Sequence, residues 1–279
     1  MELLTILIIL ANVLCSYKGF KDPSFQRRYA LDVDAVLIRK EYYRLVTSGF
    51  LHTGWFHLIF NMITLYAFGQ SLMLFIGTPL FALIYFAGLI GGNLFGLLLH
   101  RNHGDFGSIG ASGAVCGVLF ATIALFPGMD IRFFLIPIPI PAWFYGFVYI
   151  CYTIWGIRSK HDNVGHEAHL AGALTGMLLA IAFYPQSLRQ NLLPILAVAV
   201  PCIVFIYVIV RKPHLLLINN NFFNQERERR LSIDQRYNAR RIDEQKELDA
   251  ILEKIHRKGM NSLSKGEKEA LERYSRILK

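Results

Sequence analysis

A serine and three other polar residues stand inside segments that are otherwise apolar. Ser112 lies in the run GSIGASGAVCG at residues 107–117, where an apolar helix is predicted to begin. His57 and Asn61 lie in one apolar run, and His169 lies in another. Because polar groups are costly in hydrocarbon, such residues indicate a functional site by default. A hydroxyl with an imidazole that can take its proton is the minimum for nucleophilic catalysis.

Three histidines are candidates for the base that would activate Ser112: His57, His166 and His169. The i, i+4 spacing of His57 and Asn61 places both on one helical face, about 6 Å apart along the axis. Two polar residues on one face favour a site lining over a single structural histidine. His166 and His169 are one residue too close for the H-E-x-x-H zinc motif. A metal site of His57, His166 and His169 stays open as an alternative, disfavoured by its ligand count.

The segments that carry these residues have the composition of membrane spans. The 279-residue chain is 54% hydrophobic, its mean hydropathy is +0.38, and residues 45–100 contain no Asp, Glu, Lys or Arg. These values exclude an ordinary soluble domain. The apolar segments predicted to cross the membrane are Leu3–Tyr17, Trp55–Ile76, Leu80–Leu99, Ser112–Phe126, Pro141–Ile157, His166–Tyr184 and Leu192–Val210. Leu3–Tyr17 is interpreted as a retained span, because Glu2 replaces the basic start of a signal peptide.

Two features of these segments predict how the serine is positioned. Ser112–Phe126 is short for a bilayer, so Ser112 is expected below the membrane surface if the other end reaches the opposite side. Small residues predict close contacts between helices. They are Gly88, Gly91, Gly92 and Gly96 in the third segment, and Gly172 and Gly176 in the sixth.

The charged residues gather outside the apolar segments. Residues 18–54 form a long basic and aromatic connection, typical of a partly structured element at the membrane interface. From Arg211 on there are 17 Lys/Arg and 11 Asp/Glu, so the tail carries a surplus of 6 of the net charge of +9. This tail favours a membrane surface and not nucleic acid, because no nucleic-acid motif is present. Its apolar spacing predicts a helical hairpin.

Prolines and cysteines add little to the site. Pro137, Pro139 and Pro141 alternate and forbid a helix before the fifth apolar segment. The four cysteines lie in apolar runs without metal-ligand spacing or a disulfide framework, and are interpreted as small apolar fillers. They are Cys15, Cys116, Cys151 and Cys202.

Over about residues 1–185, three motifs together resemble those of the rhomboid family of intramembrane serine proteases. Gly110-Ala-Ser112-Gly113 resembles the family's G-x-S-G, Ala168-His169-Leu-Ala-Gly172 its A-H-x-x-G, and His57-x-x-x-Asn61 its H-x-x-x-N. The resemblance implies that Ser112 is the nucleophile and His169 the general base of a dyad without a triad acid. It also implies that His57 and Asn61 help to stabilise the oxyanion and that Gly110 lines the site.

The first loop is also similar to that of the family, but two positions depart from the pattern. Tyr43-Arg44 resembles a Trp-Arg pair, and His52 stands where histidine is frequent. Many relatives carry an aromatic ring, packed on the catalytic imidazole, where this chain has Cys116. The resemblance therefore implies that His169 is held less firmly here or by another residue. Relatives often carry Glu where Met73 stands, which puts the anchoring of the loop in doubt.

Together these features predict an all-α, polytopic membrane bundle. Residues 1–185 are expected to form the rhomboid protease core with six spans, residues 186–221 a seventh span, and residues 222–279 a charged helical tail. The expected function is intramembrane serine endopeptidase, acting on transmembrane protein substrates in the lipid bilayer. No cofactor, metal or nucleic acid is expected, and the expected location is a bacterial inner (plasma) membrane.

Two other functions are weighed against this one. A catalytically inactive rhomboid-like binder of membrane proteins would share the fold, although inactive relatives usually lack the serine or the histidine. A transporter with a polar site at mid-membrane is disfavoured, because the sequence shows no inverted repeat of broken helices.

Overall fold

The computed structural model describes residues 3–211 except 103, 105, 134–135 and 160–164, together with residues 251, 254, 255, 264 and 271. The chain divides into two compact units, Met1–Asn220 and Asn221–Lys279. In the second unit, Ile251 is buried against Ile255 and Leu271. The rest of the predicted C-terminal hairpin lies outside the described residues.

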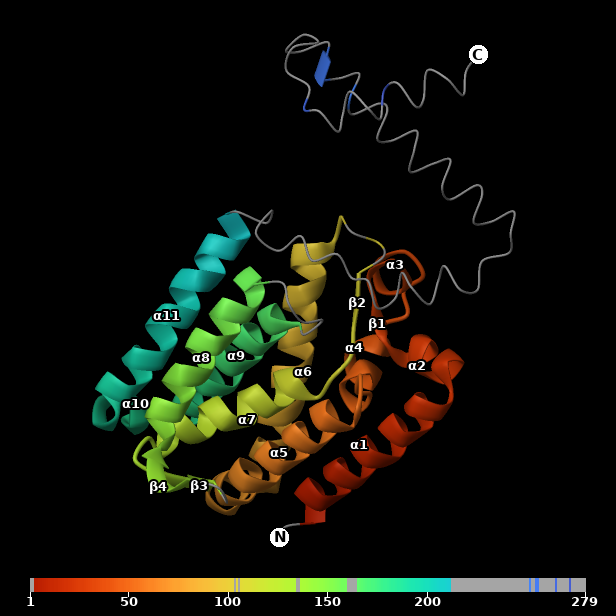
Figure 1. The fold of residues 1–279 in the computed structure, drawn as a ribbon. Coiled ribbons are helices and arrows are strands. Elements are labelled where there is room, and N and C mark those ends of the chain that lie inside the picture. The colour runs from red at the N-terminus through yellow and green to blue at the C-terminus, as the bar shows by residue number, and fades with distance from the viewer. Residues whose placement is uncertain are drawn as a thin grey trace, which may run out of the picture. The chain divides into compact units, whose positions relative to one another are not determined.

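The first unit is a bundle of apolar helices (Figure 1). The larger helices are α1 (Leu3–Lys21), α5 (Trp55–Ile76), α6 (Thr78–His100), α7 (Ser112–Leu125), α8 (Ala142–Ser159), α9 (His166–Phe183) and α11 (Leu192–Arg211). Each predicted apolar segment is therefore a helix. Five of them, namely all except α7 and α8, are long and apolar enough to cross a membrane. The chain is thus an integral, multi-pass membrane protein of the predicted all-α class.

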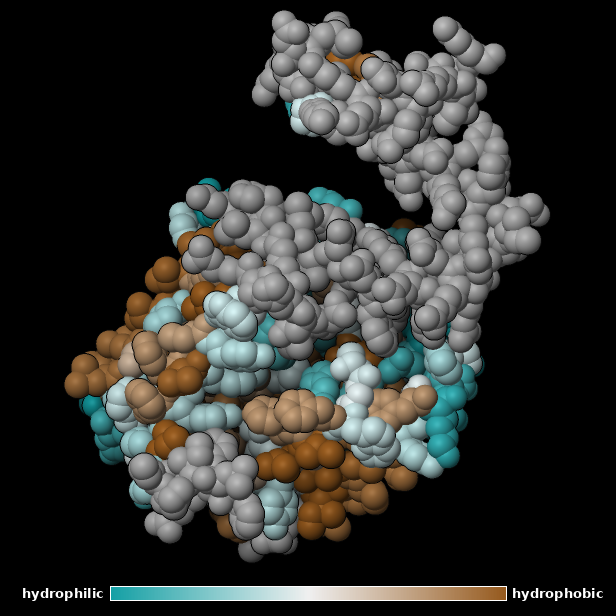
Figure 2. Space-filling model, in the orientation of Figure 1, coloured by the Kyte–Doolittle hydropathy of each residue, from teal (hydrophilic) through white to brown (hydrophobic). Residues whose placement is uncertain are grey.

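The surface of the bundle supports this assignment. In Figure 2, hydrophobic residues cover wide areas of the outer helices. Large apolar side chains point outward where water would disfavour them, such as Ile63 at 64% and Leu193 at 79% exposure. Contiguous apolar surface of this kind marks contact with lipid or with another protein.

Short elements connect the helices. They are α2 (Pro23–Tyr29), β1 (Leu31–Asp32), α3 (Val33–Leu37), α4 (Arg44–Thr47), the 3-10 turn η1 (Ser48–Phe50), β2 (Gly107–Ser108), β3 (Asp130–Phe133), β4 (Ile136–Pro141) and α10 (Gln186–Gln190). The predicted structure within residues 18–54 is thus confirmed. β1 pairs antiparallel with β2, so Leu31 lies opposite Ser108. This pairing ties the first loop to the segment that leads into Ser112.

The proline-rich segment before α8 forms a strand and not a helix, in agreement with the alternating prolines. β4 contains Pro137, Pro139 and Pro141 and pairs antiparallel with β3. Proline has no backbone N–H to donate to a ladder, and a two-stranded hairpin demands fewer donors than a central strand.

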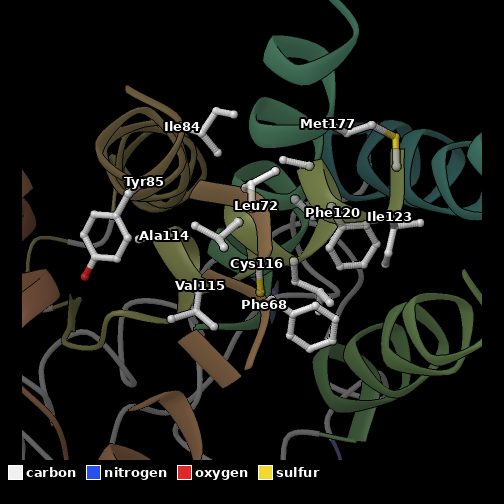
Figure 3. Close-up of a cluster of buried hydrophobic side chains, with 14 of the residues drawn as sticks. Phe68, Leu72, Ile84, Tyr85, Ala114, Val115, Cys116, Phe120, Ile123 and Met177 are labelled. Carbon is white, nitrogen blue, oxygen red and sulfur yellow. The ribbon is translucent and has the colours of Figure 1, made fainter. Parts of the chain in front are cut away.

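Helix α7 is the centre of the bundle. All residues from Gly113 to Ala124 are buried, and α5, α6, α8 and α9 surround them. A helix that is apolar on every face has no polar side to turn toward water, so burial on all sides is its stable position. Figure 3 shows Phe120 and Ile123 of α7 within the core, with Leu72 from α5 and Met177 from α9.

Glycines allow the neighbours of α7 to approach at backbone distance. A Cβ added at Gly88 of α6 would lie 3.1 Å from the carbonyl oxygen of Gly113. A Cβ at Gly172 of α9 would clash with the same carbonyl, and one at Gly176 would clash with that of Gly117. The small-residue contacts predicted for α6 and α9 are therefore confirmed at these positions. By contrast, a Cβ at Gly96 would meet nothing within 4 Å.

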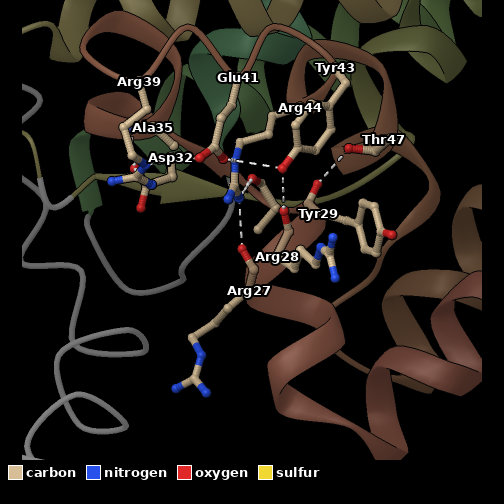
Figure 4. Close-up of polar contacts among 11 residues, drawn as sticks. Arg27, Arg28, Tyr29, Asp32, Ala35, Arg39, Glu41, Tyr43, Arg44 and Thr47 are labelled. Carbon is tan, nitrogen blue, oxygen red and sulfur yellow. Dashed lines mark hydrogen bonds and ion pairs between the residues drawn. The ribbon is translucent and has the colours of Figure 1, made fainter.

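The first loop is anchored by a buried arginine (Figure 4). The Nε of Arg44 donates to Glu41 Oε2 at 2.6 Å, and its Nη1 donates to the carbonyls of Arg27 and Ala30 at 2.7 Å each. A buried charge needs such pairing. The hydrogen bonds from Arg44 and then Arg39 lower the pKa of Glu41 to about 2.

Glu41 thus anchors the loop from within the loop itself. Met73 has a different neighbour: its sulfur accepts a hydrogen bond from Thr5 Oγ1 at 3.9 Å, which joins α5 to α1. The first loop is thus anchored without a carboxylate at residue 73, because Arg44 pairs with Glu41, three residues before it.

Candidate functional site

A pocket of about 410 Å³ brings together side chains from α5, α7, α8 and α9. Four of the five predicted site residues line it: Ser112, His169, His57 and Asn61. The remaining lining residues are Thr53, Phe56, Phe60, Thr64, Val115, Cys116, Leu119, Tyr145, Tyr149 and Tyr152. Polar groups therefore converge from segments more than 50 residues apart into a cavity that is mostly apolar.

The backbone before Ser112 is held in a conformation that suits glycine. Gly110 has a φ of +146°, and its N–H donates to the carbonyl of Ser48 at 3.0 Å. A Cβ at Gly110 would lie 2.9 Å from His57 Cε1 and 3.4 Å from Ser112 Oγ. Glycine is needed here for both reasons, strain and space. The absence of a side chain at Gly110 thus leaves room for the His57 ring near the serine hydroxyl.

His52 supports the same turn through the residue before the serine. Its Nδ1 lies 2.9 Å from Ser16 Oγ, which donates to the carbonyl of Phe50 at 3.1 Å. The Ala111 N–H donates to its Nε2 at 3.5 Å. Burial, and secondarily His57, lowers the pKa of His52 to about 3. His52 is therefore neutral near pH 7, as an accepting Nε2 requires.

His169 lies near the N-terminus of α9 and is 5% exposed. Its Nδ1 lies 3.1 Å from the hydroxyl oxygen of Tyr149 on α8. Its Nε2 has no hydrogen-bond partner among the residues that the structure describes. An imidazole nitrogen without a partner, in one pocket with a hydroxyl, is suited to take the proton of that hydroxyl.

The sequence alone does not single out Tyr149. Its hydroxyl also lies 3.2 Å from Cys116 Sγ, so Cys116 is more than an apolar filler. The sequence does contain a signal: Tyr145, Tyr149 and Tyr152 recur at helical spacing and all line the pocket. Aromatic residues at that spacing in a membrane helix are usually packing residues, and so the signal was weak.

Asn61 and His57 line the pocket from α5. The Asn61 side-chain amide donates to the carbonyl of His57 at 2.9 Å. His57 Nδ1 lies 3.2 Å from Thr53 Oγ1. An amide carries two N–H groups, so Asn61 keeps a second donor beyond the bond to its own helix. Donors at this position suit an oxygen that gains negative charge beside Ser112.

The residues next to His169 do not line the pocket. The Glu167 carboxylate pairs with His100 Nε2 of α6 at 3.3 Å, and its side chain is 1% exposed. His166 is 1% exposed and packs edge-on against the ring of Tyr152, 5.7 Å away. Within the described part of the chain, no three His, Cys, Asp or Glu residues form a group that could hold a metal ion. The alternative of a zinc site at His57, His166 and His169 is therefore not supported.

Comparisons with known proteins agree with the motifs. The model of the rhomboid domain matches residues 39–186, and that of a family of unknown function (DUF6576) matches residues 231–277. Rhomboid protein 1, mitochondrial, of Saccharomyces cerevisiae is 33% identical over 150 residues, which cover 51% of this chain and 43% of the relative. RHOMBOID-like protein 12, mitochondrial, of Arabidopsis thaliana is 30% identical over 187 residues, covering 61% and 54%.

One of the matched relatives is named as inactive. Inactive rhomboid protein 1 of Drosophila melanogaster is 28% identical over 143 residues, which cover 51% of this chain and 10% of the relative. The chain spans about half the length of the two mitochondrial relatives. The residues matched by the rhomboid domain, 39–186, include every residue that lines the pocket.

Proposed function

The chain belongs to the rhomboid family, and from the geometry of its pocket we propose that it is an intramembrane serine endopeptidase. The observation that carries the proposal is the shared pocket of Ser112 and His169, in which His169 Nε2 has no partner among the described residues. The proposed substrates are membrane-anchored proteins, cleaved in or near their transmembrane segments.

The reaction follows from the roles of these groups. Ser112 Oγ attacks the scissile carbonyl carbon while His169 Nε2 takes the hydroxyl proton. The tetrahedral intermediate places negative charge on the former carbonyl oxygen, which Asn61, His57 and the Ser112 N–H are arranged to stabilise. The C–N bond then breaks, and His169 gives its proton to the leaving amine.

Water completes the cycle. His169 takes a proton from a water molecule, the resulting hydroxide attacks the acyl-serine ester, and the proton returns to Ser112 Oγ as the acid product leaves. The site therefore needs access to water at membrane depth. Helix α7 has 14 residues and a length of about 21 Å at 1.5 Å per residue, whereas the hydrocarbon core is about 30 Å thick. With the C-terminal end of α7 at the opposite membrane surface, Ser112, at its first residue, lies within the membrane in this proposal.

Single substitutions test the dyad directly. We expect Ser112→Ala and His169→Ala each to abolish cleavage of a model transmembrane substrate by purified protein, while the melting temperature in detergent stays close to wild type. Members of a catalytic unit act together, so the double variant should be no worse than either single variant. Substantial turnover by Ser112→Ala would refute the mechanism.

The inactive binder is the second candidate, because one matched relative carries the word inactive in its name. A fluorophosphonate probe separates the two functions. Labelling of wild type that is lost in Ser112→Ala supports the protease, whereas no labelling of a folded wild-type protein supports the binder. The two mitochondrial relatives give no support to a bacterial plasma membrane. That location, and the division at residues 185 and 221, stay predictions.

A further inference from the structure

Three side chains from three helices form a continuous polar line beside the serine. His169 of α9 contacts Tyr149 of α8 at 3.1 Å, and Tyr149 contacts Cys116 of α7 at 3.2 Å. Cys116 is 2% exposed and His169 is 5% exposed, so both contacts are buried. The rings of Tyr149 and His169 are tilted by 31° with centroids 6.1 Å apart, which leaves the hydroxyl and not the ring face as the point of contact.

We propose that Tyr149 is a positioning residue for the proposed general base: its hydroxyl oxygen accepts the Nδ1–H of His169, and its own O–H donates to Cys116 Sγ. This assignment fixes the tautomer in which His169 Nε2 carries no proton. It rests on the proposed function, since only a catalytic His169 needs that nitrogen bare.

Counting protons leaves two arrangements of the line. A tyrosine hydroxyl has one proton, which can point to Nδ1 or to Sγ. If it points to Nδ1, then Nδ1 is an acceptor and the neutral ring carries its proton on Nε2, where it cannot act as a base. If it points to Sγ, then Nδ1–H donates to the tyrosine oxygen and Nε2 is free. The cysteine sulfur, although a weak acceptor, is the group that makes the second arrangement possible.

The second arrangement also persists through the reaction. When His169 takes the serine proton on Nε2, its Nδ1–H still donates to Tyr149, now from a charged ring. Hydrogen bonds from charged donors are stronger than neutral ones. The first arrangement would have to break and reorient before the ring could become doubly protonated. Tyr149 therefore favours the protonated state that forms during acyl transfer, although less than a carboxylate would.

No carboxylate of the described structure orients the His169 ring. No acidic residue lines the pocket, and Glu167, two residues from His169, is paired with His100. A hydroxyl on Nδ1 is thus the orienting group that the described structure supplies to His169.

The tautomer is directly measurable by ¹⁵N NMR of histidine-labelled protein in detergent micelles, in mildly alkaline buffer. Protonated and bare imidazole nitrogens have well-separated shifts, and the spectrum of His169→Gln identifies the His169 signals. We expect wild type to show His169 protonated at Nδ1. In Tyr149→Phe the Nε2–H form should become populated. In Cys116→Ala, the tyrosine proton is free to turn to Nδ1, so the same shift should appear.

Kinetics give a second reading of the same variants. Tyr149→Phe should lower kcat by about 10- to 100-fold, the loss expected for one hydrogen bond to a charged group, with KM within about twofold. Tyr85→Phe is the matched control, because it removes another buried hydroxyl, 3.5 Å from Asn12 Nδ2, from outside the pocket. It should change neither kcat nor the His169 spectrum.

Several outcomes overturn the assignment. They are a wild-type His169 protonated at Nε2, a Tyr149→Phe or Cys116→Ala spectrum equal to wild type, and a Tyr85→Phe effect as large as that of Tyr149→Phe. The wild-type and Cys116→Ala spectra decide if Tyr149→Phe does not fold. The spectra need no turnover, so an inactive wild type with the expected tautomer changes would refute the protease and leave the hydrogen-bond assignment standing.

Discussion

The contact between α7 and α9 sets the separation of Ser112 and His169 in our reasoning. Adding one methyl group at this contact tests it. Gly172 of α9 packs directly on the backbone of Gly113, the residue after Ser112. It follows His169 by about one helical turn along α9. In Gly172→Ala, the new Cβ clashes with the Gly113 carbonyl oxygen and lies 2.9 Å from its carbonyl carbon. These are backbone atoms of a central helix, and no side-chain rotation can relieve the contact.

The magnitude follows from the space that is missing. Two carbon atoms prefer a separation of about 3.5–4.0 Å, so the helices must move apart by at least about half an ångström. Overpacking of this kind costs about 1–3 kcal/mol, while replacing glycine inside a helix returns about 0.5–1 kcal/mol. The net effect is then a loss of about 0–2.5 kcal/mol in the free energy of unfolding, with a midpoint of about 1 kcal/mol. Because a shift of about 1 Å at a catalytic group can cost about 100-fold, turnover should fall by about 10- to 100-fold.

Gly96→Ala is the matched control, since a Cβ there meets nothing within 4 Å. It should stabilise the protein by about 0.5–1 kcal/mol and leave turnover unchanged. Unfolding in mixed detergent micelles and cleavage of a fluorescent transmembrane peptide in liposomes measure both effects. If Gly172→Ala unfolds and cleaves like Gly96→Ala, the α7–α9 contact does not set the separation of Ser112 and His169. The unfolding result stands even if the protein is no protease.

Three further predictions follow from the site and the loop. Asn61→Ala should lower turnover by about 10- to 1000-fold, the loss expected for one oxyanion donor. Turnover equal to that of wild type would leave Asn61 with only the hydrogen bond within its own helix. Because the pKa of Glu41 is about 2 in the folded protein and about 4.5 in the unfolded chain, its contribution to stability is complete above pH 4.5 and is lost as the pH falls toward 2. The melting temperatures of wild type and Glu41→Gln should differ at pH 7 and converge over that range, and a gap independent of pH would contradict this reasoning. Truncation after Asn221 should leave cleavage of a model substrate intact, because the residues that line the pocket in the described structure run from Thr53 to His169. Loss of all activity in a correctly inserted truncate would contradict this.

The sequence predicts the elements well because hydrocarbon restricts the choices. A segment such as Trp55–Ile76, apolar throughout and free of charge, has no stable form at membrane depth except a helix, and it is one. The same constraint makes Ser112, His169 and Asn61 conspicuous, since each is a polar residue in an expensive position. The glycines that the sequence displays allow α6, α7 and α9 to pack closely, and all three residues line one pocket.

Single polar contacts between helices could not be predicted in this way. The bond from His169 to Tyr149 depends on the rotation of α8 about its axis, which places Tyr149 at the ring nitrogen and Tyr152 near His166. Three tyrosines at helical spacing are compatible with several such rotations. The bond from Asn93 to the carbonyl of Leu45, at 2.8 Å, likewise joins segments 48 residues apart that no local pattern relates.

The two departures from the family pattern have a common physical explanation. At Cys116 the sequence lacks a ring against the imidazole, and at Met73 it lacks a carboxylate for the first loop. The structure supplies the first contact from α8 through Tyr149, and the second from Glu41, three residues before Arg44. A buried imidazole and a buried guanidinium each need a partner, but neither requires that the partner come from a particular helix. The small sulfur at residue 116 leaves room for the Tyr149 hydroxyl, and so the missing ring is part of the arrangement that replaces it. Substitutions at Cys116 and Tyr149 should therefore be interpreted together, because a bulky side chain at residue 116 would displace the hydroxyl that His169 contacts.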